Sequence, residues 1–310
     1  MRTVCGDGVE TAERSRWGFR HDTWLVTTAT GRHLVAQRRA GGPNPTGDAA
    51  ATIRSVVRGA GLPVPEPAGA GWDEAGRMIV TMPLVPGMVA ADLLGDDAGA
   101  ERAGAMCGAV AARLAGLDPA LIGPLAPSWT ALQGPWATAG GLRDAIPLWL
   151  DAAAPVLPVG AHTMLLGLAE RAAAETARRG TRLAHGDLAP VNLLAAPGPE
   201  HLIAAVLDLD RTRLAHPGFD AAWFGWVLEH HHPATAEAAL RGYASACGTA
   251  ETPAAAAWLQ PLVLLERLAE AAMAADAADA ADAAGHTGHT APAGAAELDR
   301  WAARLAAALR

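Results

Sequence analysis

The sequence changes character near Pro86, and this change limits the fold more than any other feature. Before it, short runs of β-forming residues alternate with Gly- and Pro-rich turns. After it, Ala- and Leu-rich segments of helical character dominate. We therefore predict an α+β protein with two lobes, a β-rich lobe over residues 1–86 and a helical lobe over residues 87–310. In a chain of 310 residues, each lobe is long enough to bury its own core.

The first lobe is predicted to contain strands around a single helix. Residues 24–39 form two strands around a turn at residues 29–31, because they are rich in β-formers and bounded by Gly. A helix is expected from Asp48, which can cap its start, to about Arg58. Residues 76–85 form a further strand. The predicted order is β-β-α-β-β.

The second lobe is predicted to be helical, with one interruption. Its clearest helices are residues 98–117, 159–179, 254–275 and 295–309. The stretch LAHGDLAPVNLL, residues 183–194, and the apolar run that follows it have the composition of strands. Residues 274–294 are low in complexity and are expected to be a surface loop or a frayed helix end.

Composition excludes several classes of protein. The chain has 24 basic residues, all of them Arg, and 32 acidic ones. No basic stripe for nucleic acid and no apolar run of about 18 residues for a bilayer is found. Charges near the N-terminus and three widely spaced cysteines indicate a cytoplasmic protein. Residues 87–310 hold 14 Arg and 24 acids, which suits a small cationic partner or serves solubility alone. No feature predicts the oligomeric state.

The interrupting stretch has the residues that phosphoryl transfer needs. That reaction requires a carboxylate to take the proton of an acceptor hydroxyl, and cations to neutralise the phosphate oxygens. Asp187 fits the role of base. Asn192 can turn its amide oxygen towards Mg²⁺, and Asp208 can add a carboxylate if residues 191–194 and 202–207 form a hairpin. The sequence therefore predicts a magnesium site between the loop and the next strand.

Three blocks together resemble the aminoglycoside phosphotransferase family, whose members are small-molecule kinases with a bilobal protein-kinase-like fold. They are H-G-D-x-x-x-x-N at residues 185–192, VLDLD at 206–210 and HPGFD at 216–220. The resemblance implies that Asp187 is the catalytic base, that His185 orients its loop, and that Asn192 and Asp208 hold Mg²⁺. It also implies that Asp220 braces the loop from a helix below, and that ATP or GTP is the phosphate donor.

The nucleotide side departs from the protein-kinase pattern. A kinase has Lys in V-A-I-K, whereas this chain reads VAQR at residues 35–38, so Arg38 is predicted to contact the phosphates. Arg39 would then point to the opposite face of the strand, although a register one residue different would turn Gln37 inward. The partner Glu of the kinase helix is missing, so either the ion pair is absent or Asp48, the only acid there, takes its place.

Two further parts of the nucleotide site are expected. Gly18 is the only glycine of the phosphate loop, where protein kinases have three. Residues 82–85, with Met82 and Leu84, would form the linker that hydrogen-bonds the nucleotide base.

Four acids are candidates for binding an acceptor amine: Asp210, Glu229, Glu266 and Glu270. The alternative is a solvated helix face with Arg partners such as Arg267. Asp210 shares a strand face with Asp208, so it supports the metal or orients the neighbouring arginines. Trp129, Trp136 and Trp149 either pack in the core or line the acceptor site. Three consecutive histidines at 230–232 cannot all ligate one ion on a regular helix.

The predicted function is phosphorylation of a hydroxyl on a small, cationic antibiotic. Within the family, the chain resembles the viomycin and capreomycin phosphotransferases, so the acceptor is a tuberactinomycin peptide or an aminoglycoside. One alternative is a metabolic kinase of the same fold that acts on a sugar, homoserine or choline. Another is a kinase-like module that holds nucleotide without chemistry. The acceptor hydroxyl and the preference for ATP or GTP are not encoded in a recognisable pattern.

Overall fold

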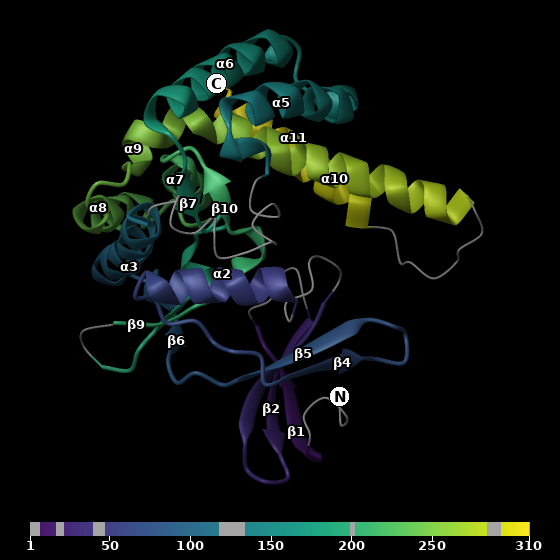
Figure 1. Ribbon diagram of the computed structural model, residues 1–310, viewed down its shortest axis with the longest axis vertical. Helices are drawn as coiled ribbons and strands as arrows, with labels where there is room; N and C mark the ends of the chain where they lie inside the picture. Colours follow the sequence, from purple (N-terminus) through teal and green to yellow (C-terminus); the bar gives the residue numbers. More distant parts are fainter. Residues whose placement is uncertain are drawn as a thin grey trace.

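The computed structural model describes residues 7–16, 22–39, 47–117, 134–198, 202–283 and 293–309. It has a β-sheet at one end and a body of helices at the other (Figure 1). The predicted α+β fold with a β-rich and a helical part is confirmed. The predicted division at residues 86 and 87 falls in the connection between strand β5, which ends at Pro83, and the short strand β6, Met88–Val89.

The sheet has five antiparallel strands in the order β1-β2-β3-β5-β4. Their bounds are β1 Val9–Arg14, β2 Asp22–Thr28, β3 His33–Arg38, β4 Gly69–Trp72 and β5 Met78–Pro83. The predicted hairpin is β2–β3, and Gly31 at its turn has a φ of 79°, which favours glycine. The structure adds one strand, β1, to the predicted order. Five of its six residues are exposed, so it lacks the apolar alternation of a half-buried strand.

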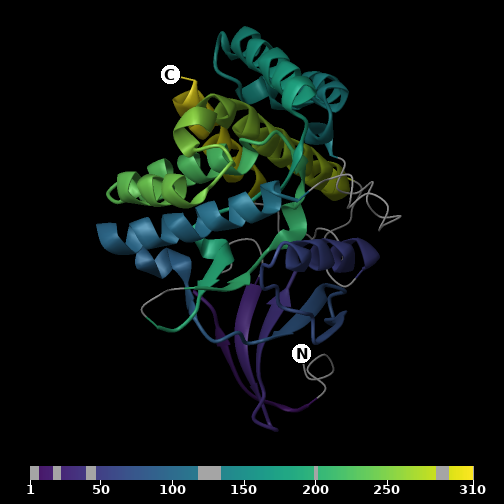
Figure 2. The same cartoon turned by 60° about the vertical axis from the view of Figure 1, so that its left-hand side comes forward.

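Helix α2, Asp48–Gly59, lies between the sheet and the helical body, as both views show (Figures 1 and 2). Ile53 and Val56 of this helix pack against Leu214, which belongs to strand β10, Arg213–Ala215. The helix that follows the third strand therefore also contacts the helical part, next to the segment that carries Asp208.

The helical body contains α3 Asp97–Ala115, α5 Ala139–Ala153, α6 Ala161–Arg179, α7 Phe219–His231, α8 Ala236–Ala246, α9 Pro253–Ala256, α10 Gln260–Ala283 and α11 Ala293–Ala308. Helices α3 and α8 pack closely because Gly104 of α3 faces the backbone of α8 and Gly242 of α8 faces the backbone of α3. A Cβ on Gly104 would lie 1.9 Å from the oxygen of Ala239. None of the described helices is long and apolar enough to cross a membrane.

The four predicted helices are present, with differences at their ends. Residues 254–275 divide into α9, a short 3₁₀ turn and α10. Helix α10 continues to Ala283, so the first half of the low-complexity segment is helical, while residues 284–292 lie outside the described part.

Short strands frame the predicted catalytic loop. Strand β7, Arg182–Ala184, leads into it and pairs with β10. Strand β8, Leu193–Ala195, leads out of it and pairs with β9, Ile203–Val206. The predicted hairpin is therefore confirmed, with Leu193 opposite Val206. This pairing brings the end of the loop beside the residues that precede Asp208.

Candidate active site

The start of the catalytic loop is held by a buried carboxylate from α7. Asp220 accepts hydrogen bonds from the backbone N–H groups of His185, at 2.7 Å, and Gly186, at 2.9 Å. Both oxygens of Asp220 are thus used, and only 5% of the residue is exposed. Burial raises the pKa of Asp220, while His185 and the two backbone donors act in the opposite direction. The predicted brace from the helix below therefore has a defined geometry.

The His185 ring links the loop to the strand that precedes Asp208. Its Nε2 lies 2.9 Å from the carbonyl oxygen of Leu207, and its Nδ1 lies 3.3 Å from the backbone nitrogen of Asp187. One neutral tautomer satisfies both contacts, with the proton on Nε2 donated to Leu207 and Nδ1 accepting from Asp187. The residue is fully buried. The ring therefore ties the backbone of the candidate base to the neighbouring strand.

Gly186 has a conformation and a position that no other residue fits. Its φ is 80°, and an added Cβ would lie 2.0 Å from the carbonyl oxygen of Arg211. On the other side, Arg267 of α10 donates from Nη2 to the Gly186 oxygen over 2.6 Å. The loop is therefore packed tightly between the segment after Asp208 and α10.

Asn192 is oriented by the candidate base. Its Nδ2 donates to the backbone oxygen of Asp187 over 2.8 Å and lies 3.4 Å from the Asp187 carboxylate. Because the side-chain nitrogen faces Asp187, the side-chain amide oxygen of Asn192 points away from Asp187. The backbone oxygen of Asn192 accepts from the N–H of Leu207 over 2.8 Å, so Asn192 sits beside the residue that precedes Asp208.

Asp208 has the only positive φ of any non-glycine residue in the described ranges, at 52° with ψ of 61°. Such a left-handed conformation is uncommon outside glycine and is often found where function requires it. The Asp208 carboxylate and the Asn192 amide oxygen are donors that suit Mg²⁺, which takes few protein ligands and completes its shell with phosphate oxygens and water. The part of the chain that the structure describes contains no group of three His, Cys, Asp or Glu residues that could hold a metal ion.

The two arginines at the end of β3 point in different directions. Arg38 donates from Nε to Asp22 of β2 over 3.0 Å and lies over the Trp24 ring, 5.2 Å from its centroid. This hydrogen bond lowers the pKa of Asp22. Arg39 instead crosses to the helical part, where it forms an ion pair with Asp210. Arg38, which was predicted to contact the phosphates, is bonded to Asp22, whereas Arg39 approaches the segment that follows Asp208.

The other predicted nucleotide contacts are placed as follows. Met82 lies in β5 opposite Val35. The backbone N–H of Leu84 donates to the oxygen of His33 over 3.0 Å, so this N–H already has a partner within the sheet. Gly18 lies outside the described residues.

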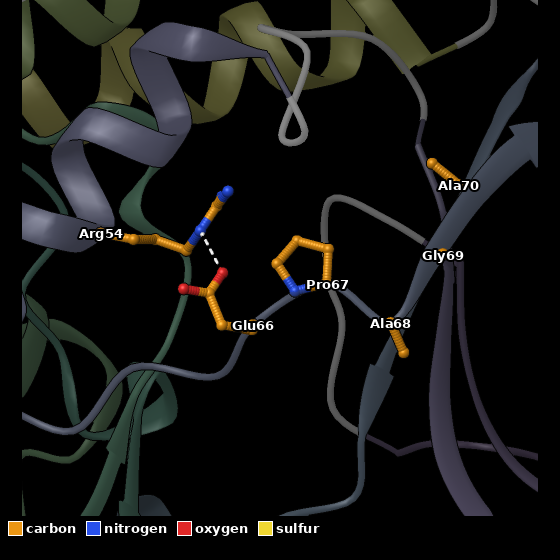
Figure 3. Close-up of a pocket in the computed structure, with 6 residues that line it drawn as sticks. All are labelled: Arg54, Glu66, Pro67, Ala68, Gly69 and Ala70. Carbon is orange, nitrogen blue, oxygen red and sulfur yellow. Dashed lines mark hydrogen bonds and ion pairs between the residues drawn. The ribbon is translucent and has the colours of Figure 1, made fainter.

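A pocket of about 340 Å³ lies beside α2 and the start of β4, lined by Arg54, Glu66, Pro67, Ala68, Gly69 and Ala70 (Figure 3). Arg54 donates from Nε to Glu66 over 3.1 Å, and Arg58 of the same helix bonds the other oxygen of Glu66. The basic residues of α2 thus face an acid outside the helix. The pocket contains none of the predicted site residues.

The two acids of α10 that were predicted to bind an acceptor amine are paired with arginines. Glu270 forms a bidentate pair with Arg211, at 3.1 and 2.8 Å. Glu266 is 4% exposed and pairs with Arg213. Burial raises the pKa of Glu266, although Arg213 opposes this effect. Both acids thus have arginine partners, but these arginines lie more than 50 residues away along the chain and Glu266 is buried, so a solvated face with local partners does not describe them either.

Of the remaining candidates, Glu229 is exposed near the end of α7. Trp136 and Trp149 are packing residues, because both are buried and the Trp136 ring contacts Phe219 at a centroid distance of 4.9 Å. Trp129 lies outside the described residues. Sequence reasoning did not single out the contacts of Arg39 and Arg267, since both depend on residues far away along the chain.

The sequence model of a phosphotransferase enzyme family matches residues 11–262. The chain belongs to this family. No match was found among curated proteins. The fold resembles that of APH(2")-IIIa in complex with GDP and kanamycin, with a TM-score of 0.64 at 16% identity over 99% of this chain and 96% of that one.

Two other solved antibiotic phosphotransferases have a similar fold. A thermostable variant of APH(4)-Ia, in a ternary complex with ADP and hygromycin B, gives a TM-score of 0.56 at 14% identity over 97% of this chain and 94% of that one. The macrolide 2'-phosphotransferase MphH from Brachybacterium faecium gives 0.53 at 18% identity, over 97% and 93%.

Proposed function

We propose that this phosphotransferase moves the γ-phosphate of ATP or GTP to a hydroxyl of a small cationic antibiotic in the cytoplasm. One observation carries the proposal. Hydrogen bonds hold Asp187 and Asn192 beside Leu207, the residue that precedes Asp208. Asp220 holds the backbone of residues 185 and 186, the His185 ring bonds Leu207, and Asn192 bonds both Asp187 and Leu207. Phosphoryl transfer depends on such positioning more than on covalent chemistry.

Each residue has a defined task in this proposal. The Asp187 carboxylate accepts the proton of the acceptor hydroxyl and orients its oxygen towards the phosphate. The Asn192 amide oxygen and the Asp208 carboxylate would hold Mg²⁺, which when bound neutralises the phosphate oxygens. Asp220 and His185 hold the loop in place without contacting the reactants.

On the nucleotide side, we propose Arg39 in place of the kinase lysine. Its side chain is 7% exposed and already lies next to Asp210, two residues after Asp208. A guanidinium can grip two phosphate oxygens at once. Asp210, itself 13% exposed, replaces the carboxylate that the α2 helix lacks after Asp48.

The class of acceptor rests on charge and on the structural neighbours. Residues 87–310 have ten more acids than arginines. Solved structures with the same fold contain kanamycin or hygromycin B, both bearing hydroxyl groups, and one is a macrolide kinase. A tuberactinomycin peptide or an aminoglycoside fits this surplus of acids. Because Glu266 and Glu270 are paired with arginines, their contribution to amine binding is smaller than the sequence predicts.

The test is a panel of acceptors incubated with protein, Mg²⁺ and ATP or GTP, followed by mass spectrometry. We expect a basic antibiotic to gain the mass of one phosphoryl group. Asp187→Ala should lower kcat by about 10³-fold while leaving nucleotide affinity within about twofold, because the base acts only on the acceptor. Equal turnover of a neutral sugar or of homoserine would instead indicate a metabolic kinase. Unchanged turnover in Asp187→Ala would remove this residue from the mechanism.

A further inference from the structure

Helix α10 places three charged residues against the segments that carry the candidate base and the metal ligand. Arg267 bonds the Gly186 oxygen, Glu270 pairs with Arg211, and Glu266 pairs with Arg213. All three lie beyond residue 262, where the match to the family ends. Glu266 and Glu270 were expected to bind an acceptor amine or to lie on a solvated face with partners such as Arg267. Instead, both pair with arginines of another segment, and Glu266 is buried.

The contact of Arg267 is directed at the peptide bond that sets the direction of Asp187. The Gly186 carbonyl and the Asp187 N–H belong to the same planar unit, so fixing the oxygen also fixes the nitrogen. Arg267 holds the oxygen over 2.6 Å, and the His185 ring lies 3.3 Å from the nitrogen. Because glycine has wide backbone freedom, this peptide would turn easily without these two contacts.

Arg267 is itself buried against α7, so its position is restrained by packing. Its side chain is 4% exposed, and its guanidinium lies 5.0 Å from the centroid of the Trp223 ring on α7. Its Nη1 is 3.7 Å from Glu270. A buried, charge-assisted hydrogen bond to a carbonyl is stronger than a neutral one, and its loss leaves a buried oxygen unsatisfied.

Glu270 extends the same support to the segment after Asp208. It grips Arg211 with both oxygens, and the backbone oxygen of Arg211 is the group that excludes a side chain at Gly186. The loop with the base and the segment with the metal ligand therefore contact each other and share one supporting helix.

We infer that Arg267 is a positioning residue for the catalytic loop, assisted by Glu270. Through these two residues, α10 sets the orientation of Asp187 without contacting its side chain. The inference rests on the proposed function for its catalytic consequence, but its structural consequence can be measured without any acceptor. Arg267 touches no reactant, and its influence passes through the Gly186 carbonyl.

The test compares Arg267→Met with Arg304→Met. Both changes remove a guanidinium that lies against tryptophan rings: Arg304 of α11 lies 4.5 Å from the centroid of Trp301 and 5.2 Å from that of Trp226. Methionine keeps much of the apolar stem in each case. Arg267→Met alone removes the bond to the loop. Hydrogen–deuterium exchange of a peptide covering residues 183–194 reports the order of the loop in the nucleotide-free protein.

We expect exchange in this peptide to rise about tenfold or more in Arg267→Met and to stay at the wild-type rate in Arg304→Met. Arg267→Lys, which keeps one donor, should restore part of the protection. For turnover, Arg267→Met should lower kcat by about 10- to 100-fold with KM for nucleotide within about twofold, because a displaced base is costly while phosphate contacts persist.

Equal exchange in the wild type and Arg267→Met would overturn the inference, as would an equal rise in Arg304→Met. If Arg267→Met does not fold, Arg267→Lys and Glu270→Gln take its place. Loop exchange at the wild-type rate in both of these would count against the inference in the same way. A wild type that phosphorylates no acceptor defeats the proposed function, while the exchange result still decides the role of Arg267.

Discussion

The predicted catalytic loop and the β-rich lobe differ in the burial and contacts of their candidate site residues. In the loop, His185 is fully buried, and backbone groups of residues 185–187 are bonded to Asp220, Arg267 and the His185 ring. In the sheet, β1 is mostly exposed, and Arg38 is engaged with Asp22. The arginine that reaches the helical part, Arg39, does so through an ion pair between the lobes. The backbone around Asp187 is thus held by residues of the helical lobe, while the Arg39–Asp210 pair joins the two lobes, so we propose that phosphate positioning depends on how the lobes meet.

The largest effect should come from a change at Asp208, the proposed metal ligand of the helical lobe. Asp208→Asn keeps the shape of the side chain but removes the charge that a hard cation requires. We expect kcat to fall by about 10³-fold, since metal stabilisation of phosphoryl transfer is worth several kcal/mol. Titrating Mg²⁺ during turnover should also show a higher requirement in the variant. Asp144→Asn, on the exposed face of α5, is the control, and an equal loss there would point to a nonspecific effect.

The next largest effect tests whether Asp220 of α7 supports the catalytic loop. Asp220→Asn replaces one of two accepting oxygens with an NH₂ group that faces a backbone N–H. We expect a loss of about 2–3 kcal/mol in the free energy of unfolding, because one buried donor loses its charged partner. Denaturant unfolding measures this change, and turnover should fall by about 10- to 100-fold at a temperature where the variant is folded. Stability and turnover both at wild-type values would show that the loop needs no brace.

A smaller effect, on the KM for nucleotide, should distinguish the two neighbouring arginines of the β-rich lobe. Arg39→Gln removes the guanidinium that pairs with Asp210, whereas Arg38→Gln removes the one that pairs with Asp22. We expect KM for nucleotide to rise about tenfold in the first variant, for the loss of one charged phosphate contact, and to change less than about twofold in the second. The reverse order in steady-state kinetics would return the phosphate contact to Arg38.

The catalytic loop and the strands around it could be predicted from the sequence, because their residues are close together along the chain. The loop motif and the strand pairing around it involve residues 183–220. The face on which Arg38 and Arg39 lie could not be predicted, since a shift of one residue in a strand exchanges its two faces. The partners of Glu266 and Glu270 lie more than 50 residues away and become neighbours only when α10 packs. Strand β1 was not predicted, because its sequence, VETAER, is mostly polar and five of its six residues are exposed.

The central claim is that Asp187, Asn192 and Asp208 surround a metal-bound triphosphate. A crystal structure with Mg²⁺ and a non-hydrolysable ATP or GTP analogue tests it most directly. The account predicts Mg²⁺ bound by the Asn192 amide oxygen and the Asp208 carboxylate, with the terminal phosphate facing Asp187. A triphosphate bound away from these side chains, or a metal held by neither Asn192 nor Asp208, would contradict it.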